Sequence, residues 1–179
     1  MVALLAKDLA AMKLDNPFSK YDYQGLLQHH FWSGKYFYDD ISKKGYVAGD
    51  ANIFPFLLGI VTDQKMRESA LAKIHEEGLD EPFPLKYTSG RNKARFIWQE
   101  IFLHNYEGNA IWMHMGPLYV ILLQQVYKKR AEEYKQRYKD LIEKHVNFLE
   151  VFDANGKPFS TPFYRCDRGM LWAANYLTL

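Results

Sequence analysis

Residues 105–127 read "NYEGNAIWMHMGPLYVILLQQVY", and they contain the start of a buried helix. From Gly116 onward the residues are almost all apolar, and Pro117 suits the first turn of a helix because that turn leaves its N–H groups unpaired in any case. The stretch therefore predicts a buried helix that begins near Pro117. Apolar side chains continue at spacings of three and four over residues 127–149, which predicts a second helix or one kinked helix.

The same spacing predicts further helices on both sides of this stretch. They cover residues 2–14, 19–32, 63–78 and, at the end of the chain, 169–177, while residues 92–104 favour a helix more weakly. Two short β-like runs around Lys43-Lys44-Gly45 predict a small hairpin or a loop. We expect one all-α domain over residues 1–179, with six or seven paired helices and long connections between them.

The composition limits the function classes. The net charge of +2 over 179 residues is too small to indicate a nucleic-acid or membrane surface. The chain has a single cysteine, Cys166, which favours a reducing compartment. Lys7 and Asp8 interrupt the only apolar stretch at the N-terminus, and no run approaches the roughly 18 apolar residues of a membrane span. We expect a cytoplasmic protein that binds neither nucleic acid nor membranes.

Aromatic and carboxylate side chains gather in the predicted connections, at residues 31–52, 82–91, 105–116 and 150–172. Loops on a rigid scaffold are common places for binding sites. Aromatic rings beside carboxylates suit carbohydrate, because a sugar presents both C–H faces and hydroxyl edges. The alternative is that these aromatic side chains are core packing, which is the commoner role of such residues.

One carboxylate is unusual in its position. Glu150 lies within the apolar run of "NFLEVFDANG" (residues 147–156), near the predicted end of a helix, where the helix dipole disfavours a negative charge. Either Glu150 points into solvent while its neighbours point inward, or it faces a polar pocket.

Four segments resemble the six-hairpin, (α/α)6-barrel glycosidases, which include trehalases, processing α-glucosidases and the glucosidase part of glycogen-debranching enzymes. They are "HHFWSGKYFYDD" with "GYVAGDANIFPFLLGIV", then "NYEGNAIWMHMGPLYVIL", "NFLEVFDANGKP" and "YRCDRGMLWAANYL". Their order matches the family, and together they extend over about residues 30–179. In the second segment the spacing from Gly108 to Trp112 is one residue longer than the family's Gly-x-x-Trp element.

The resemblance implies a fold, an activity and a set of site residues. Glu150 would be the general base that activates water in the inverting hydrolysis of α-glucosidic oligosaccharides. The implied substrate-binding residues are Trp32, Asp50, Glu107, Trp112, Tyr164 and Trp172. Many relatives have an arginine in place of Glu107, which leaves the identity of the sugar open. The six histidines form no metal-binding pattern, and we expect no metal and no cofactor.

The resemblance implies only the C-terminal half of such a barrel. Inverting hydrolysis needs an acid and a base about 6.5–9.5 Å apart, and the segment that carries the family's acid has no counterpart here. Three explanations stay open: a complementary N-terminal half supplies the acid, the chain forms a homo-oligomer, or Asp40 or Asp50 acts as the acid. A glycan-binding or interaction module without catalysis, and a sugar isomerase or epimerase, are the alternative functions.

Overall fold

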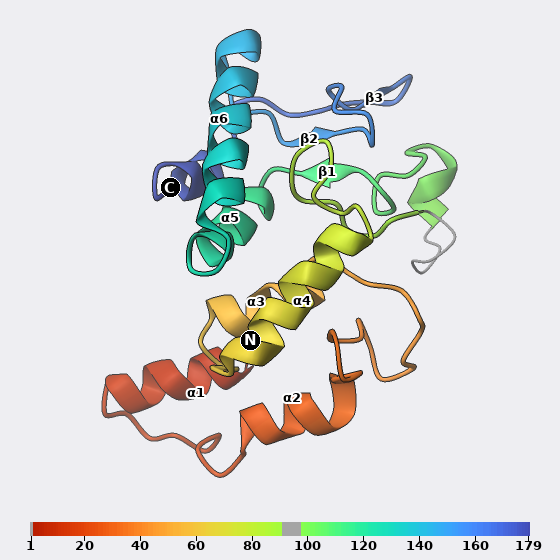
Figure 1. The fold of residues 1–179 in the computed structure, drawn as a ribbon. Helices are drawn as coiled ribbons and strands as arrows, with labels where there is room; N and C mark the ends of the chain where they lie inside the picture. Colours follow the sequence, from red (N-terminus) through yellow and green to blue (C-terminus); the bar gives the residue numbers. More distant parts are fainter. Residues whose placement is uncertain (1, 91–97) are drawn as a thin grey trace.

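The computed structural model describes residues 2–90 and 98–179 (Figure 1). Its α-helices are α1 (Val2–Ala11), α2 (Tyr23–Phe31), α3 (Phe54–Leu57), α4 (Gln64–Glu76), α5 (Gly116–Gln124), α6 (Lys128–His145) and α7 (Ala173–Tyr176). The 3-10 helices are η1 (Asp50–Asn52) and η2 (Trp98–Ile101). The strands are β1 (Ile111–Trp112), β2 (Val151–Phe152), β3 (Ser160–Thr161) and β4 (Tyr164–Arg165).

The predicted fold class is wrong, because the chain is not an all-α half-barrel of paired helices. About 43% of the structure is helical, and two small antiparallel sheets, β1–β2 and β3–β4, occupy the predicted connections. Helices α3 and α7 each contain only four residues. Within residues 2–90 and 98–179, extensive packing of one helix on another occurs between α5 and α6 alone. The other segments are connected by loops and short strands.

Helices α5 and α6 form the hairpin that residues 105–149 predict as one of two alternatives. Pro117 lies in the first turn of α5, and the turn 125–127 leads directly into α6. One face of α6 buries Ala131, Tyr134 and Tyr138, at spacings of three and four residues. The two-helix alternative is therefore confirmed, and the single kinked helix is excluded. Figure 1 shows α6 standing beside α5 in the half of the molecule that also carries both sheets.

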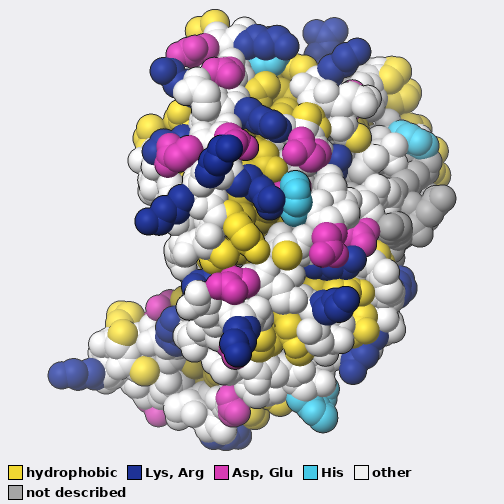
Figure 2. Space-filling view, viewed as in Figure 1, with side chains coloured by type: hydrophobic (Ala, Val, Ile, Leu, Met, Phe, Trp, Pro, Cys, Tyr) yellow, Lys and Arg dark blue, Asp and Glu magenta, His cyan; other side chains and the backbone are white. Residues whose placement is uncertain are grey.

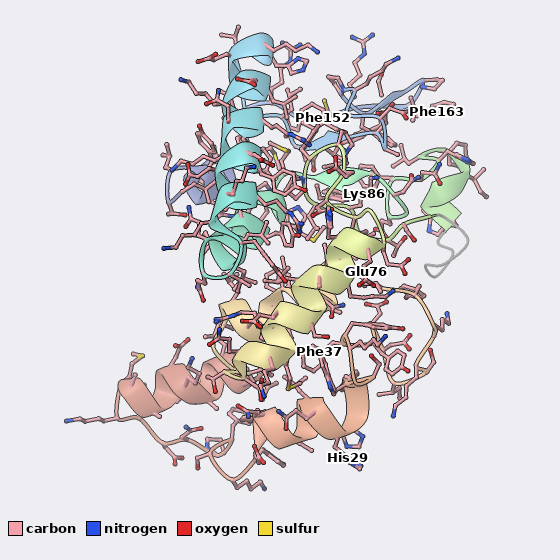
Figure 3. All side chains as sticks on the ribbon, viewed as in Figure 1. His29, Phe37, Glu76, Lys86, Phe152 and Phe163 are labelled. Atoms are coloured by element: carbon pink, nitrogen blue, oxygen red, sulfur yellow. The ribbon has the colours of Figure 1, made fainter. Side chains whose placement is uncertain are left out.

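The main core joins α4 and the residues before it to this hairpin. One cluster of buried apolar side chains extends from Phe37, before η1, to Phe152 in β2, and it includes Leu71 and Ile74 of α4. Figure 3 marks Phe37 and Phe152 on either side of α4. Asn52 is fully buried in this core, where its side chain bonds to both the N–H and the carbonyl of Phe37. Residues far apart in the sequence thus share one core.

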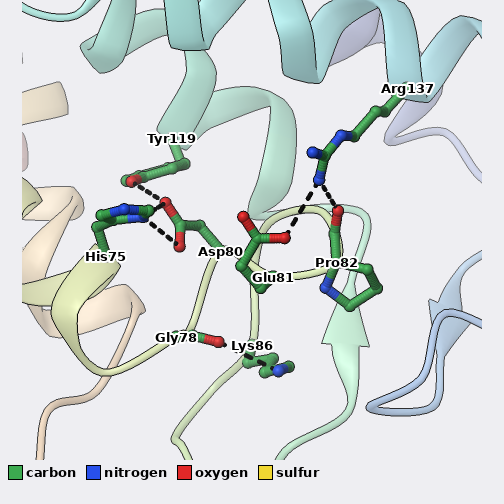
Figure 4. Close-up of polar contacts among 8 residues, drawn as sticks. All are labelled: His75, Gly78, Asp80, Glu81, Pro82, Lys86, Tyr119 and Arg137. Atoms are coloured by element: carbon green, nitrogen blue, oxygen red, sulfur yellow. Dashed lines mark hydrogen bonds and ion pairs between the residues drawn. The ribbon is translucent and has the colours of Figure 1, made fainter.

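A buried carboxylate lies where α4 meets the hairpin. Asp80 has no exposed surface, and both of its oxygens lie 3.1 Å from Nδ1 of His75 (Figure 4). Its Oδ2 accepts a hydrogen bond of 2.9 Å from the Tyr119 hydroxyl of α5, and the Tyr134 hydroxyl of α6 donates to the same carboxylate. Burial first, and then Asp80, raise the pKa values of both phenols, so both hydroxyls keep their protons. Asp80 therefore links three helices through hydrogen bonds.

The residues between α2 and η1, 32–49, form a loop with one isolated bridge, between Trp32 and Phe37, so the loop alternative holds there. The weak helix prediction over residues 92–104 falls partly on 91–97, which lie outside the described residues, and η2 follows them.

Figure 2 shows Lys and Arg side chains mixed with Asp and Glu over one face of the molecule. None of the described helices is both long and apolar enough to cross a lipid bilayer.

Candidate functional site

Glu150 lies five residues beyond the end of α6 and directly before β2. Its N–H donates to the Asp167 carbonyl at 3.2 Å, and its own carbonyl accepts from the Met113 N–H at 3.0 Å. The side chain is half-buried, and Oε2 accepts hydrogen bonds from the Tyr164 hydroxyl and from the Asp167 N–H. Glu150 is therefore not a helix-end residue that points into solvent. It is held between two backbone segments and a tyrosine.

Aromatic side chains from three segments form a series of ring contacts that starts at Tyr164, the tyrosine bonded to Glu150. The Tyr106 hydroxyl donates to the Tyr164 hydroxyl at 3.3 Å, and the two ring centroids are 5.2 Å apart. Trp112 packs against Tyr106 at 4.7 Å and donates its indole N–H to the Tyr106 carbonyl. His114 lies 5.3 Å from Trp112 on one side and 5.4 Å from Trp172 on the other. We call these five residues together with Glu150 the Glu150 site.

Burial and the Glu150 charge determine which titratable side chains of the site keep their protons. Burial lowers the pKa of His114 despite the nearby Glu150 carboxylate, so the imidazole is neutral at pH 7 and has one donor and one acceptor nitrogen. Burial also raises the pKa of Tyr106, and Glu150 and Glu107 act in the same direction. The Cys166 thiol has a pKa raised by burial and then by Glu150, which makes it a poor nucleophile. The site thus contains one carboxylate among neutral donors and acceptors.

A second group of predicted residues lies around Tyr87. Burial raises the pKa of Tyr87 to about 12, with contributions from Asp50, which accepts a hydrogen bond from this phenol, and from Glu107. Burial raises the pKa of Asp50 as well, followed by repulsion from Asp39. Glu107 contributes to the raised pKa of both Tyr87 and Tyr106. Asp50 starts η1 and bonds to the Ala51 N–H, and it is not a cap of α3.

The structure brings Glu150, Trp112, Tyr164 and Trp172 into one group and leaves the other predicted residues, Trp32, Asp50 and Glu107, outside it. Trp112, Tyr164 and Trp172 belong to the Glu150 site, whereas Trp32 packs against Phe37 at 4.9 Å in the main core. Asp40, an alternative acid, is exposed and accepts hydrogen bonds from Ser42. No group of three or more metal-binding side chains occurs among the residues that the structure describes.

Two members of the site, Tyr106 and His114, are not among the predicted residues. His114 has no periodic signal in the sequence, because it lies in the turn 113–115 that follows β1. Tyr106 has no such signal either, since its place depends on the return of the chain at Tyr164. Comparison with known proteins adds no further assignment: no protein-family model and no curated protein matches the chain.

Proposed function

We propose that the Glu150 site binds an oligosaccharide and that Glu150 is the general base in the hydrolysis of an α-glucosidic bond. The observation that carries this proposal is a single half-buried carboxylate among the aromatic side chains Tyr106, Trp112, Tyr164 and Trp172. Aromatic faces can stack on the C–H faces of a sugar ring, while the neutral His114 and the phenols can bond to its hydroxyls. The short motifs that resemble glycosidase segments imply the same role for Glu150, although the chain does not have the all-α half-barrel fold of that family.

The geometry of Glu150 is compatible with water activation. Both recorded hydrogen bonds reach Oε2, and Oε1 accepts none from the part of the chain that the structure describes. A water bound to Oε1 could therefore transfer its proton to the carboxylate as it attacks the sugar. Tyr87, Asp50 and Glu107 supply further polar groups, which could bond to the hydroxyls of additional sugar units. This arrangement suits an oligosaccharide better than a single sugar.

The acid for this reaction would come from another chain. Inverting hydrolysis needs a second carboxyl about 6.5–9.5 Å from the base. Phe163 lies next to Tyr164 of the site, is 74% exposed and packs against Phe102 at 5.4 Å. A second copy, or a complementary chain that covers these two rings, would stand beside Glu150. We propose that such a contact completes the catalytic pair.

The test combines a binding measurement with an activity assay. We expect the protein to bind maltotriose in isothermal titration calorimetry and to release glucose from it. Glu150→Gln should reduce hydrolysis about 10²–10⁴-fold and leave binding within about threefold, because only the base is lost. Trp172→Ala should weaken binding by roughly tenfold or less, since it removes one stacking face. The matched control is Glu143→Gln, an exposed glutamate on α6 that should leave both unchanged.

The alternatives give different outcomes in the same assays. Maltotriose binding without glucose release, in the wild type, would leave a glycan-binding module and remove the catalytic role. Conversion of free glucose into another sugar without hydrolysis would favour the isomerase or epimerase alternative. If maltotriose and longer maltodextrins fail to bind, the whole proposal is wrong.

A further inference from the structure

A cavity lies beside the C-terminal end of α6, on the side of the β3–β4 sheet. Its volume is about 490 Å³, and its polar side chains come from Arg165, Arg168, His145 and Ser160. Leu149 and Phe159 supply part of its apolar wall. No carboxylate lines this cavity, although acidic side chains are nearly as numerous as basic ones in the chain. We call it the arginine cavity.

The backbone holds the polar side chains in place. Ser160 of β3 lies directly opposite Arg165 of β4, so their side chains project from the same face of this sheet. Arg168 is fixed by a bridge to Leu149, and the N–H of Cys166 donates to the Phe159 carbonyl at 3.0 Å. Both arginines are therefore attached to paired backbone and do not extend from a free loop.

Both guanidinium groups lack an anionic partner within the described residues. No ion pair or side-chain hydrogen bond is recorded there for Arg165 or Arg168, whereas Arg137 is paired with Glu81. Asp167 lies between them in the sequence, but its carboxylate accepts from the Arg168 N–H and does not line the cavity. The two arginines thus place positive charge at the wall of the cavity, and no lining carboxylate neutralises it.

His145 adds a third polar group to the wall. Its Nε2 is buried and has no hydrogen-bond partner in the described part of the chain. Burial, and then the positive charges of Lys144 and Arg168, lower the pKa of its imidazole. A negative ion in the cavity would offset that repulsion and offer the ring an acceptor after a small rotation.

We propose that the arginine cavity binds an oxyanion of the phosphate type. Guanidinium groups bond to phosphate oxygens through two parallel N–H groups, and the Ser160 hydroxyl supplies a further donor. This site is distinct from the Glu150 site. Tyr164 and Arg165 are consecutive residues of β4, so their side chains leave opposite faces of the strand. The cavity therefore extends the proposed function without depending on it.

The experiment is a titration of the full chain with inorganic phosphate, followed by calorimetry and by the NMR signals of the His145 ring. We expect saturable binding that shifts those signals and weakens as sodium chloride is added, because the arginines are exposed and screened. Arg165→Gln and Arg168→Gln should each weaken binding about tenfold, since each removes a charge-assisted contact. Lys139→Gln removes one positive charge at a different position, on α6, and should leave the affinity unchanged.

Glucose 6-phosphate and glucose distinguish the source of the oxyanion. Tighter binding of glucose 6-phosphate than of inorganic phosphate would assign the cavity to a phosphorylated sugar, and equal affinities would assign it to the free ion. Absence of saturable phosphate binding would overturn the proposal. Phosphate binding that stays unchanged in both arginine variants, with melting temperatures equal to wild type, would overturn it as well. No glycan hydrolysis is measured, so the result is independent of the role of Glu150.

Discussion

The two oxygens of Glu150 differ in their surroundings, and this difference decides what a substitution can reveal. Oε2 accepts from Tyr164 and from the Asp167 N–H, while Oε1 has no recorded partner among the described residues. A glutamine at this position can keep a carbonyl oxygen where Oε2 is now and so preserve both contacts. The loss of activity expected for Glu150→Gln would then report the missing base and not a displaced loop.

Asp80 provides a prediction for stability at a single residue. It is fully buried and accepts hydrogen bonds from Tyr119 and Tyr134, with His75 at 3.1 Å. In Asp80→Asn one acceptor oxygen becomes an N–H₂ group that cannot accept from a tyrosine hydroxyl. We expect the free energy of unfolding to fall by about 2–4 kcal/mol, measured by urea denaturation.

The control for this prediction is the neighbouring carboxylate. Glu81 is exposed and pairs with Arg137 at 3.2 Å, so Glu81→Gln should cost less than about 1 kcal/mol. Equal losses in the two variants would mean that Asp80 does not have the structural role argued for it.

At the scale of elements, the contact between α5 and α6 depends on one glycine. A Cβ atom on Gly116 would overlap the Tyr138 hydroxyl and lie 2.6 Å from the Pro84 carbonyl. Tyr138 is fully buried and donates to that same carbonyl at 2.8 Å. We expect Gly116→Ala to lower the free energy of unfolding by about 2–3 kcal/mol through overpacking, measured by thermal and urea unfolding.

Two further variants separate overpacking from a general glycine effect. Tyr138→Phe alone should cost about 1 kcal/mol, but combined with Gly116→Ala the total should be smaller than the sum, because the hydroxyl that clashes is gone. Gly45→Ala, where an added Cβ meets nothing within 4 Å, should be nearly neutral. Strict additivity in the double variant would refute the proposed clash.

The elements also explain which parts of the fold were predictable. The α5–α6 hairpin follows from Pro117 and from apolar spacings of three and four, which are long enough to define a helical period. The end of α6 could not be predicted in this way, because Val146 adopts a left-handed conformation (φ 50°) that is rare for a β-branched residue. The strands contain two residues each, too few for an alternation to be visible. The all-α prediction failed for that reason.

The candidate site shows a similar division. The order of the short motifs predicted several site residues at once, and the structure brings four of them together: Glu150, Trp112, Tyr164 and Trp172. Trp32 lies apart from this group and packs against Phe37, although it is half-buried like Trp112. The arginine cavity had no advance signal, since Arg165 and Ser160 meet only through strand pairing.

For the whole molecule, the exposed apolar surface raises the question of its oligomeric state. Trp98, Ile101 and Phe102 of the η2 region are exposed, and Phe102 packs against the exposed Phe163. Exposed apolar side chains that lie close together favour association. A symmetric dimer would use the same surface on both copies and would place one copy beside the Glu150 site of the other.

We expect light scattering to give twice the 21.1 kDa mass of the chain. Phe163→Ser combined with Ile101→Glu should return the mass to 21.1 kDa, because both substitutions make the shared surface polar. Ile41→Ser is the matched control, since Ile41 is 79% exposed but lies in another loop, and this variant should remain dimeric. A wild-type mass of 21.1 kDa over a roughly hundredfold range of concentration would rule out self-association. The acid that Glu150 needs would then have to come from a different chain, and a pull-down with Phe163→Ser as the negative control would be the way to find it.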